Sequence, residues 1–365
     1  MRMIAAIVLA FLAVSPATLA SPATLAPHAS TLALGATGEL SGVSCPSSTT
    51  CYAVGQLGPS PAVITRTTND GGSWTVSVAP KVTELQGIAC PTPTNCVAVG
   101  DLGNMQGAVL LTSDGGASWS SASLPSAVGM VYAVSCPSAA VCFAVTDSLS
   151  RPPSVIRSTN GGATWSPQVL PLADRQGSLY SVSCASSTVC AVGGALRDAS
   201  DDLVIDLTRD GGVAWEQGGL SPHETLGAVS GTACAWGTST CLAVGQAEEP
   251  DPVQVWKAVG VGTRWATVGW DYGDGPSGLG ALNAIVCPSA ADCYAVGQAA
   301  DGVSGAIFST TDGGQAWRPA QLPASVSDLE AVSCSGPTTC MAVGVSGEGE
   351  DAVLTTADGA TWSLT

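Results

Sequence analysis

Short apolar runs, rich in β-branched residues and bounded by Gly or Asp, recur along the chain. Three of them are Ala62–Thr65, Ala108–Leu111 and Ala352–Thr355. Runs of this length and composition are typical of β-strands. No segment shows the apolar period of 3.6 residues that marks an amphipathic helix. The pattern therefore predicts an all-β protein built from many short strands.

A polar stretch follows most of these runs. It reads Ser/Thr-x-Asp-x-Gly-x-Ser/Thr-Trp, as in Thr112–Trp119, and decayed copies end at Trp265 and Trp362. A short acceptor side chain bonds nearby backbone N–H groups, and Gly supplies the positive φ that such turns need. We call this stretch the tryptophan turn and expect it to join two strands. Its acceptors and tryptophans are Asn69 and Trp74, Asp114 and Trp119, Asn160 and Trp165, Asp210 and Trp215, Asp312 and Trp317, and Asp358 and Trp362.

All 14 cysteines lie in close pairs. Six pairs have five intervening residues and one has six. In an exported chain, an even number of cysteines in regular pairs predicts disulfides. The alternative is zinc, whose ligands usually have two to four intervening residues and often include His. The expected disulfides are Cys45/Cys51, Cys90/Cys96, Cys136/Cys142, Cys184/Cys190, Cys234/Cys241, Cys287/Cys293 and Cys334/Cys340.

The cysteine pairs and the tryptophan turns share one period. Successive pairs begin 45 to 53 residues apart, and each pair begins 28 to 31 residues before its Trp. The second repeat predicts strands at Leu85–Cys90, Cys96–Gly100 and Ala108–Thr112, and a fourth from Trp119 to about Leu124. Seven four-stranded antiparallel repeats, each with one hairpin disulfide, predict a seven-bladed β-propeller over residues 39–365. A β-solenoid is the alternative.

The N-terminus has the order of a secretory signal peptide over residues 1–26. A basic start precedes the apolar run Ile4–Val14, and two copies of Ser-Pro-Ala-Thr-Leu-Ala follow. Cleavage is expected after Ala20 or Ala26, and a retained anchor is the alternative. Residues 27–38 would form a linker or a strand that closes the ring. We expect a secreted monomer that is not inserted in a membrane after cleavage.

The composition restricts the partners. The formal net charge is −17, although only 11% of the residues are charged. Nucleic acids and anionic membranes both attract basic surfaces, so we expect neither as a partner.

Topology predicts where a ligand would bind. In a four-stranded meander the tryptophan turns and the cysteine loops share one face, here the turn face. The opposite face carries the loops between second and third strands and the links between blades, and it differs most between repeats. We call it the variable face and expect binding there.

The variable face carries charged candidates. Arg151, Arg175 and Arg197 could together hold a carboxylate; ordinary surface arginines are the alternative. Three acidic clusters could bind Ca²⁺, the one cofactor we consider, or a cationic partner; solvated loops are the alternative. The clusters are Asp198, Asp201 and Asp202; Glu248, Glu249 and Asp251; and Glu348, Glu350 and Asp351.

The fifth repeat is irregular and adds aromatic candidates. After its decayed turn it carries Trp270, Asp271, Tyr272 and Asp274. Aromatic rings beside carboxylates could stack on a sugar or a peptide, and a plain loop is the alternative. His223 and His28 are the only histidines, so a Ser-His-Asp triad is poorly supported.

The tryptophan turn resembles the Asp-box, or BNR repeat, of sialidases and related β-propellers. That resemblance implies an Arg triad, an Asp acid/base and a Tyr/Glu pair. The Arg-Ile-Pro signature expected before the first turn is missing, so no catalytic residue can be assigned. Seven-bladed propellers with this box include xyloglucan-type glycosidases and photosystem II assembly factors. The paired cysteines are most similar to those of exported actinobacterial propellers.

These observations favour a secreted, non-catalytic binding module for a glycan or a protein at the cell envelope. A glycoside hydrolase of unknown specificity is the alternative, and a purely structural envelope component is a third.

Overall fold

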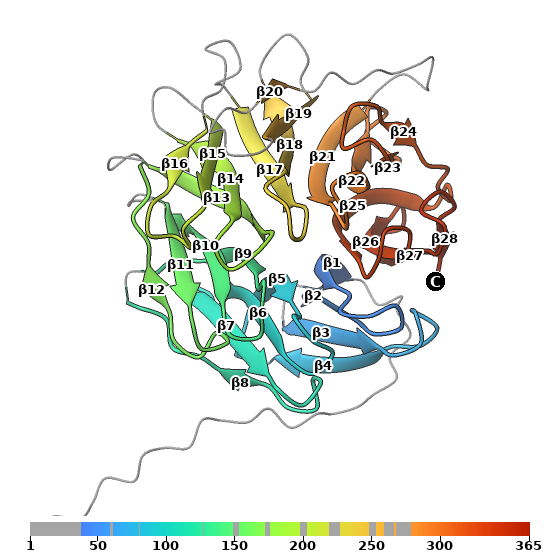
Figure 1. Cartoon of the computed structure of the whole chain (residues 1–365). Helices are drawn as coiled ribbons and strands as arrows, with labels where there is room; N and C mark the ends of the chain where they lie inside the picture. Colours follow the sequence, from blue (N-terminus) through green and yellow to red (C-terminus); the bar gives the residue numbers. More distant parts are fainter. Residues whose placement is uncertain are drawn as a thin grey trace, which may run out of the picture.

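The computed structural model describes residues 38–58, 61–79, 81–126, 128–148, 153–171, 176–197, 203–218, 227–247, 253–258, 266–267 and 279–365. These residues form 28 strands and no helix, and therefore none of them forms a helix that could cross a membrane. The strands make seven four-stranded antiparallel blades in a ring (Figure 1). The predicted seven-bladed β-propeller is confirmed. The predicted signal peptide lies outside the described residues.

Each blade runs outward from the ring axis in chain order. The innermost strands are β1 (Gly38–Ser44), β5 (Glu84–Ala89), β9 (Val131–Ser135), β13 (Gly177–Cys184), β17 (Gly227–Cys234), β21 (Leu279–Val286) and β25 (Val326–Cys334). The second strands are β2 (Cys51–Leu57), β6 (Cys96–Asp101), β10 (Cys142–Ser148), β14 (Cys190–Leu196), β18 (Cys241–Ala247), β22 (Cys293–Ala299) and β26 (Cys340–Ser346).

The two outer positions are unequal in length. The third strands are β3 (Ala62–Thr67), β7 (Gly107–Thr112), β11 (Ser154–Ser158), β15 (Leu203–Thr208), β19 (Val253–Ala258), β23 (Gly305–Thr310) and β27 (Asp351–Thr356). The outermost strands are β4 (Thr75–Ala79), β8 (Ser120–Ser121), β12 (Ser166–Pro167), β16 (Glu216–Gln217), β20 (Ala266–Thr267), β24 (Arg318–Pro319) and β28 (Ser363–Leu364).

The predicted length of the outermost strand was wrong. A strand was expected from Trp119 to about Leu124, but β8 covers only Ser120–Ser121. Trp119 is 3% exposed and packs between the first two blades, and the chain leaves the sheet soon after it. The last blade is not shorter than the others, because β28 has two residues like most outermost strands. Of residues 27–38 only Gly38 is described, and it begins β1.

The tryptophan turns form the expected hydrogen bonds. In the second blade the Thr112 hydroxyl donates to the Asp114 carboxylate over 2.8 Å, and the Gly116 N–H donates to the Thr112 hydroxyl over 2.9 Å. The N–H of Gly115 donates to the carbonyl of Thr94 in the cysteine loop of the same blade, over 3.0 Å. Turns and cysteine loops therefore share one face, as predicted.

All seven predicted disulfides are present, each within one blade. The blades are held together by other contacts. Phe143 of the third blade packs edge-on against Trp215 of the fourth, and Tyr294 of the sixth packs against Trp362 of the seventh. Burying such rings between sheets stabilises the ring through the hydrophobic effect.

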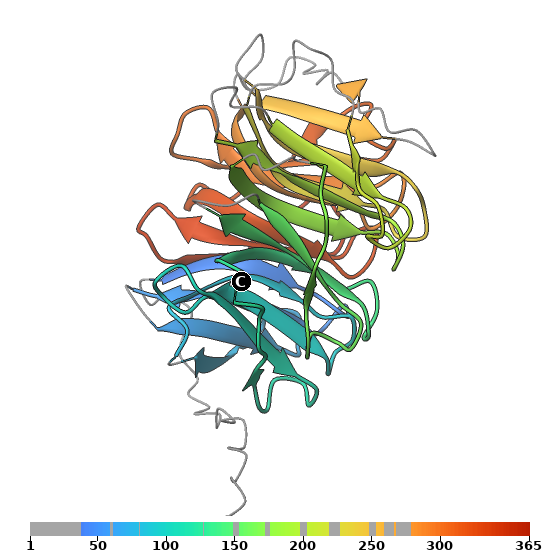
Figure 2. The same ribbon diagram turned by 90° about the vertical axis from the view of Figure 1, so that its left-hand side faces the viewer.

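A hydrogen bond near the axis also repeats between blades. The serine before the first cysteine of one blade accepts from the N–H of the first cysteine of the next blade. Ser44 accepts from Cys90 in this way, Ser135 from Cys184 and Ser183 from Cys234. The seventh and first blades use the same bond, because Ser333 accepts from Cys45 over 3.0 Å. The first blade (blue) accordingly lies beside the seventh (red) in Figures 1 and 2.

One core position in the fourth blade departs from the pattern. Asp206 of β15 occupies the slot that holds Leu110, Ile156 or Leu354 in other blades. It is 0% exposed, and neither of its carboxyl oxygens has a hydrogen-bond partner among the described residues. Burial raises the pKa of Asp206 to about 7.

We expect this carboxyl to make stability depend on pH. Because its folded pKa lies above the unfolded value, its contribution is complete below about pH 4 and is lost as pH rises through about 7. Asp206→Asn removes the titration, so it should unfold at higher urea concentration than the wild type at pH 8. The advantage should be on the order of a few kcal/mol and should shrink at pH 5. An equal difference at both pH values would contradict this assignment.

Candidate functional site

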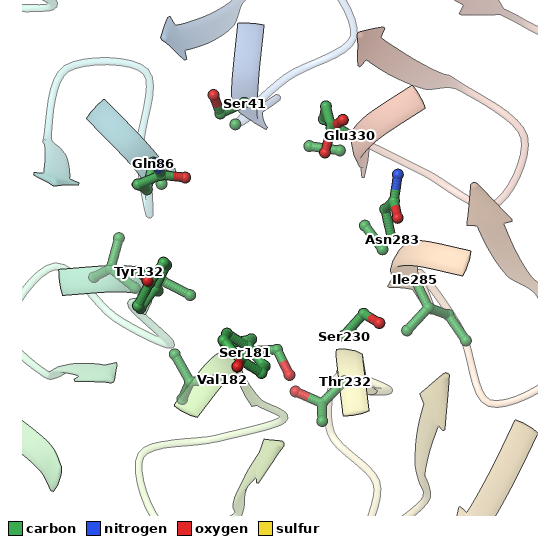
Figure 3. Close-up of a pocket in the computed structure, with 18 of the residues that line it drawn as sticks. Ser41, Gln86, Tyr132, Ser181, Val182, Ser230, Thr232, Asn283, Ile285 and Glu330 are labelled. Carbon is green, nitrogen blue, oxygen red and sulfur yellow. The ribbon is translucent and has the colours of Figure 1, made fainter. Parts of the chain in front are cut away.

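The seven innermost strands surround a cavity of about 550 Å³ on the ring axis. Figure 3 shows residues from all seven blades placed around this opening. A volume of this size is within the usual range of ligand pockets. The cavity is the centre of the candidate site.

A β-bulge in every blade faces this cavity. In every blade the pairing between the innermost and second strands skips the fourth residue before the first cysteine, and the sixth and seventh blades have a second skip nearer the start of the strand. Bulges re-aim a side chain that would otherwise follow the sheet alternation. All seven bulged residues line the cavity and are partly exposed. We call them the bulge ring: Ser41, Gln86, Tyr132, Tyr180, Ser230, Asn283 and Glu330.

Glycine in the second strand makes room for the bulge. The residue four positions after the second cysteine is Gly in six of seven blades. A Cβ at Gly55 would lie 1.9 Å from the Glu39 carbonyl oxygen, and one at Gly245 would lie 2.1 Å from the Ala228 carbonyl oxygen. No side chain fits against backbone at these distances. In these blades the glycine therefore allows the innermost strand to approach the second strand this closely.

The third blade is the exception, because Thr146 replaces this glycine. Its innermost strand still bulges, at Tyr132, and the Asp147 N–H still donates to the Met130 carbonyl over 2.9 Å. The end of β10 also pairs with β13 of the fourth blade, Asp147 with Ser178, and joins the two blades into one eight-stranded sheet.

An apolar tier lies below the bulge ring, toward the turn face. It consists of the residues two before each first cysteine, which are Val or Ile in six blades, for example Val182 and Ile285. The fifth blade has Thr232 instead, which is 6% exposed and whose hydroxyl has no hydrogen-bond partner among the described residues. Thr232 borders the opening in Figure 3. A buried, unpaired hydroxyl at a cavity wall suits a polar group that enters the cavity.

The third and fourth blades form a tyrosine wall, defined here as Tyr132, Tyr180, Asp147 and Arg197. The two rings meet edge to face with centroids 5.7 Å apart. The Arg197 guanidinium donates to the Tyr180 hydroxyl over 3.4 Å, and the Ser178 hydroxyl donates to the buried Asp147 over 2.7 Å. Burial and the Asp147 charge raise the pKa of Tyr132 to about 12. Both hydroxyls are thus already hydrogen-bonded, since the Tyr132 hydroxyl donates to Asp147 over 3.5 Å. The partly exposed rings remain able to stack on a ligand.

The seventh, first and second blades form an acidic wall on the variable face: Glu39, Glu84, Asp101, Asp328, Glu330 and Asp351. Of these, Glu330 lines the cavity and lies across the opening from Tyr132 in Figure 3. The Asn283 amide of the sixth blade donates to Asp328 over 3.0 Å. The described part of the chain places no Lys or Arg in an ion pair with any carboxylate of this wall.

Burial and mutual repulsion raise the pKa values of carboxyl groups in the acidic wall. Burial, and then the charges of Asp328 and Glu39, raise the pKa of Glu330 to about 7. Burial and Glu39 raise the pKa of Asp351 to about 6. The pKa values of Glu84 and Asp328 are also raised, chiefly by burial. A group with such a pKa in a cavity is a candidate functional residue.

Only part of the predicted site can be compared with the structure. Arg197 is exposed and belongs to the tyrosine wall; Asp351 belongs to the acidic wall, and Glu348 and Glu350 are exposed in the loop before it. Among the described residues no three acidic, His or Cys side chains are grouped to hold a metal ion. The remaining candidates lie outside the described residues: Arg151, Arg175, Trp270, Asp271, Tyr272, Asp274, His223, Asp198, Asp201, Asp202, Glu248, Glu249 and Asp251.

The bulge ring was missed, although the sequence contains its signal. In every repeat the fifth residue before the first cysteine is Leu or Val, and the third is Gly, Ala or Ser. Between them stand Ser, Gln, Tyr, Tyr, Ser, Asn and Glu. A polar residue that differs between repeats, inside a strand whose other positions are constant, is not required for the packing of the blades.

The fold is similar to known propellers. No protein-family model matches the chain, and no curated protein matches its sequence. A structure of YCF48 bound to D1 peptide matches with a TM-score of 0.60 and 15% identity, over 94% of this chain and 99% of that chain. YCF48 from Cyanidioschyzon merolae matches with a TM-score of 0.62 and 16% identity, over 90% and 97%.

A GH74 xyloglucanase from Xanthomonas campestris also matches, with a TM-score of 0.63 and 14% identity over 93% of this chain. This chain covers only 55% of the xyloglucanase. At these identities the similarity shows a common β-propeller fold.

We expect the glycines under the bulges to be essential for stability. Gly245→Ala places a Cβ against backbone that cannot move without breaking the sheet, so it should lower the free energy of unfolding by about 1–3 kcal/mol. Urea denaturation measures the change. The control is Gly336→Ala, where nothing lies within 4 Å of the added Cβ. Similar unfolding midpoints for both variants would show that the bulge tolerates a side chain.

We expect Glu330 to titrate far above an ordinary glutamate. Carboxyl ¹³C NMR should show one Glu signal with a midpoint of about 7, absent in Glu330→Gln. Glu39→Gln removes a neighbouring negative charge, so it should lower that midpoint. A midpoint that Glu39→Gln leaves unchanged would mean that repulsion between these carboxylates is negligible.

Proposed function

We propose that the protein is a secreted, non-catalytic binding module whose ligand enters the central cavity from the variable face. The ligand is a glycan or a protein of the cell envelope. The observation that carries the proposal is the bulge ring, in which a constant framework presents seven polar side chains to one cavity. A repeated scaffold that carries a variable, partly exposed polar position in each repeat suits a binding surface.

Two further observations support a binding role outside the cytoplasm. Seven disulfides are stable in an oxidising compartment and rare in a reducing one. The similar fold of YCF48 has been captured with a bound peptide, so a propeller of this general form can hold a protein ligand. The tyrosine wall offers the stacking surface that both sugars and peptides use.

A glycoside hydrolase is the second candidate, and Glu330 is the observation that favours it. Its raised pKa of about 7 would keep it protonated in mildly acidic medium, as a general acid must be. Inverting and retaining hydrolysis both need a second carboxylate, and the acidic wall contains several. Turnover and binding therefore have to be measured together.

We expect the exported protein to be retained on a glycan array or on envelope proteins without cleaving a panel of fluorogenic glycosides. Tyr180→Ala removes a ring that lines the cavity, so the retained ligand should bind about tenfold more weakly or worse. Binding is measured by surface plasmon resonance against the retained ligand.

The matched control is Trp236→Ala. Trp236 is 77% exposed on a cysteine loop of the turn face, so its loss should leave binding unchanged. Binding that depends on Trp236 and not on Tyr180 would place the site on the turn face. Glycoside turnover that disappears in Glu330→Gln would establish the enzyme instead.

A further inference from the structure

We propose that the acidic wall binds a cationic side chain, Lys or Arg, presented by an extended segment of a protein ligand. This inference rests on the proposed function and narrows its ligand to a basic protein segment. Glu330 is the residue that we expect to contact the cation, because it alone of the acidic wall lines the cavity.

The first argument is uncompensated charge. The six carboxylates come from three neighbouring blades, and among the described residues the ion pair found joins Arg209 to Glu216 in the fourth blade, away from this wall. Glu84 and Asp101 stand directly opposite each other on paired strands. Like charges in that position destabilise a sheet. A cation from outside would remove this repulsion.

The second argument is unsatisfied polar atoms. Asp101 is 9% exposed, and one of its carboxylate oxygens has no hydrogen-bond partner in the described part of the chain. One oxygen of Asp351 is buried without a partner in the same way. Glu39 exerts a repulsive charge on Glu84, Asp328, Glu330 and Asp351. Desolvated carboxylates without donors are costly, and donors from a ligand would offset that cost.

The third argument is the shape and chemistry of the cavity. The cavity that Glu330 lines also contains apolar side chains, including Val182 and Ile285, which can contact the methylene stem of a long side chain. Across the opening from Glu330 lies Tyr132, against which Tyr180 packs edge to face, and such rings attract a cation or an adjacent peptide group. Lys and Arg combine an apolar stem with a charged end, whereas a neutral sugar would leave the carboxylates uncompensated.

A protein segment fits better than a free amine. Glu330 of the acidic wall lies across the opening from Tyr132 of the tyrosine wall, and only a ligand with several groups can contact both. Neither do the described carboxylates form a ready metal site. A ligand peptide that inserts one basic side chain into the cavity and lies across the variable face would contact both walls.

The test begins with a library of random twelve-residue peptides displayed on phage and selected on the disulfide-intact protein. We expect the selected peptides to be enriched in Lys or Arg at one shared position. One such peptide is then synthesised, and its affinity is measured by fluorescence anisotropy for the wild type, Glu330→Gln and Glu350→Gln. Measured at pH 8, above the Glu330 pKa of about 7, both variants lose one negative charge, but Glu350 is exposed in the loop before β27.

Glu330→Gln should weaken binding by about tenfold or more, whereas Glu350→Gln should change it by less than about twofold. Replacing the shared Lys by norleucine should abolish binding, and replacing it by Arg should not. Equal losses in both variants would show that only the net charge of the protein matters, and this would overturn the inference.

The other outcomes separate the inference from the proposed function. Selected peptides without enriched basic residues, or an empty selection, overturn the inference. If such peptides, or a glycan, still depend on Tyr180, the binding module stands with a different ligand. If nothing that binds depends on Tyr180 or on Glu330, both fail.

Discussion

The structure depends on one close backbone contact, repeated around the ring. In six of the seven blades the innermost strand approaches a glycine of the second strand to a distance that excludes any Cβ. At this contact the innermost strand bulges at the same residue, and the bulge turns one side chain out of the sheet. A framework position and a ligand-facing position are therefore set by the same local geometry.

The contacts between blades stabilise the fold, and the side chains that face the axis form the candidate site. Between blades, rings such as Phe143 and Trp215 bury apolar surface, while each disulfide constrains only its own hairpin. At the axis the bulged side chains are partly exposed and lie outside the packing between sheets, so this position differs in identity between blades. The acidic and tyrosine walls result from this variation, because Glu330 and Tyr180 occupy equivalent positions in different blades.

Much of the fold was readable from the sequence because its signals are local. The cysteine pairs, the tryptophan turns and the runs before them fixed the repeat, the strand order and the turn face. The outermost strands were overestimated, since the burial of Trp119 between blades depends on a neighbour that one repeat does not show. The acidic wall was also invisible, because Glu39 and Glu330 are almost 300 residues apart and meet only when the ring closes.

The junction between the last and first blades has a consequence for how the ring is held. Ser333 and Cys45 make the bond that Ser44 and Cys90 make elsewhere, and each blade in the described part of the chain is built from one continuous stretch. The contact between the seventh and first blades is thus of the same kind as the contacts between blades that the chain connects directly. The ring is closed by these non-covalent contacts, so its continuity does not depend on the continuity of the chain.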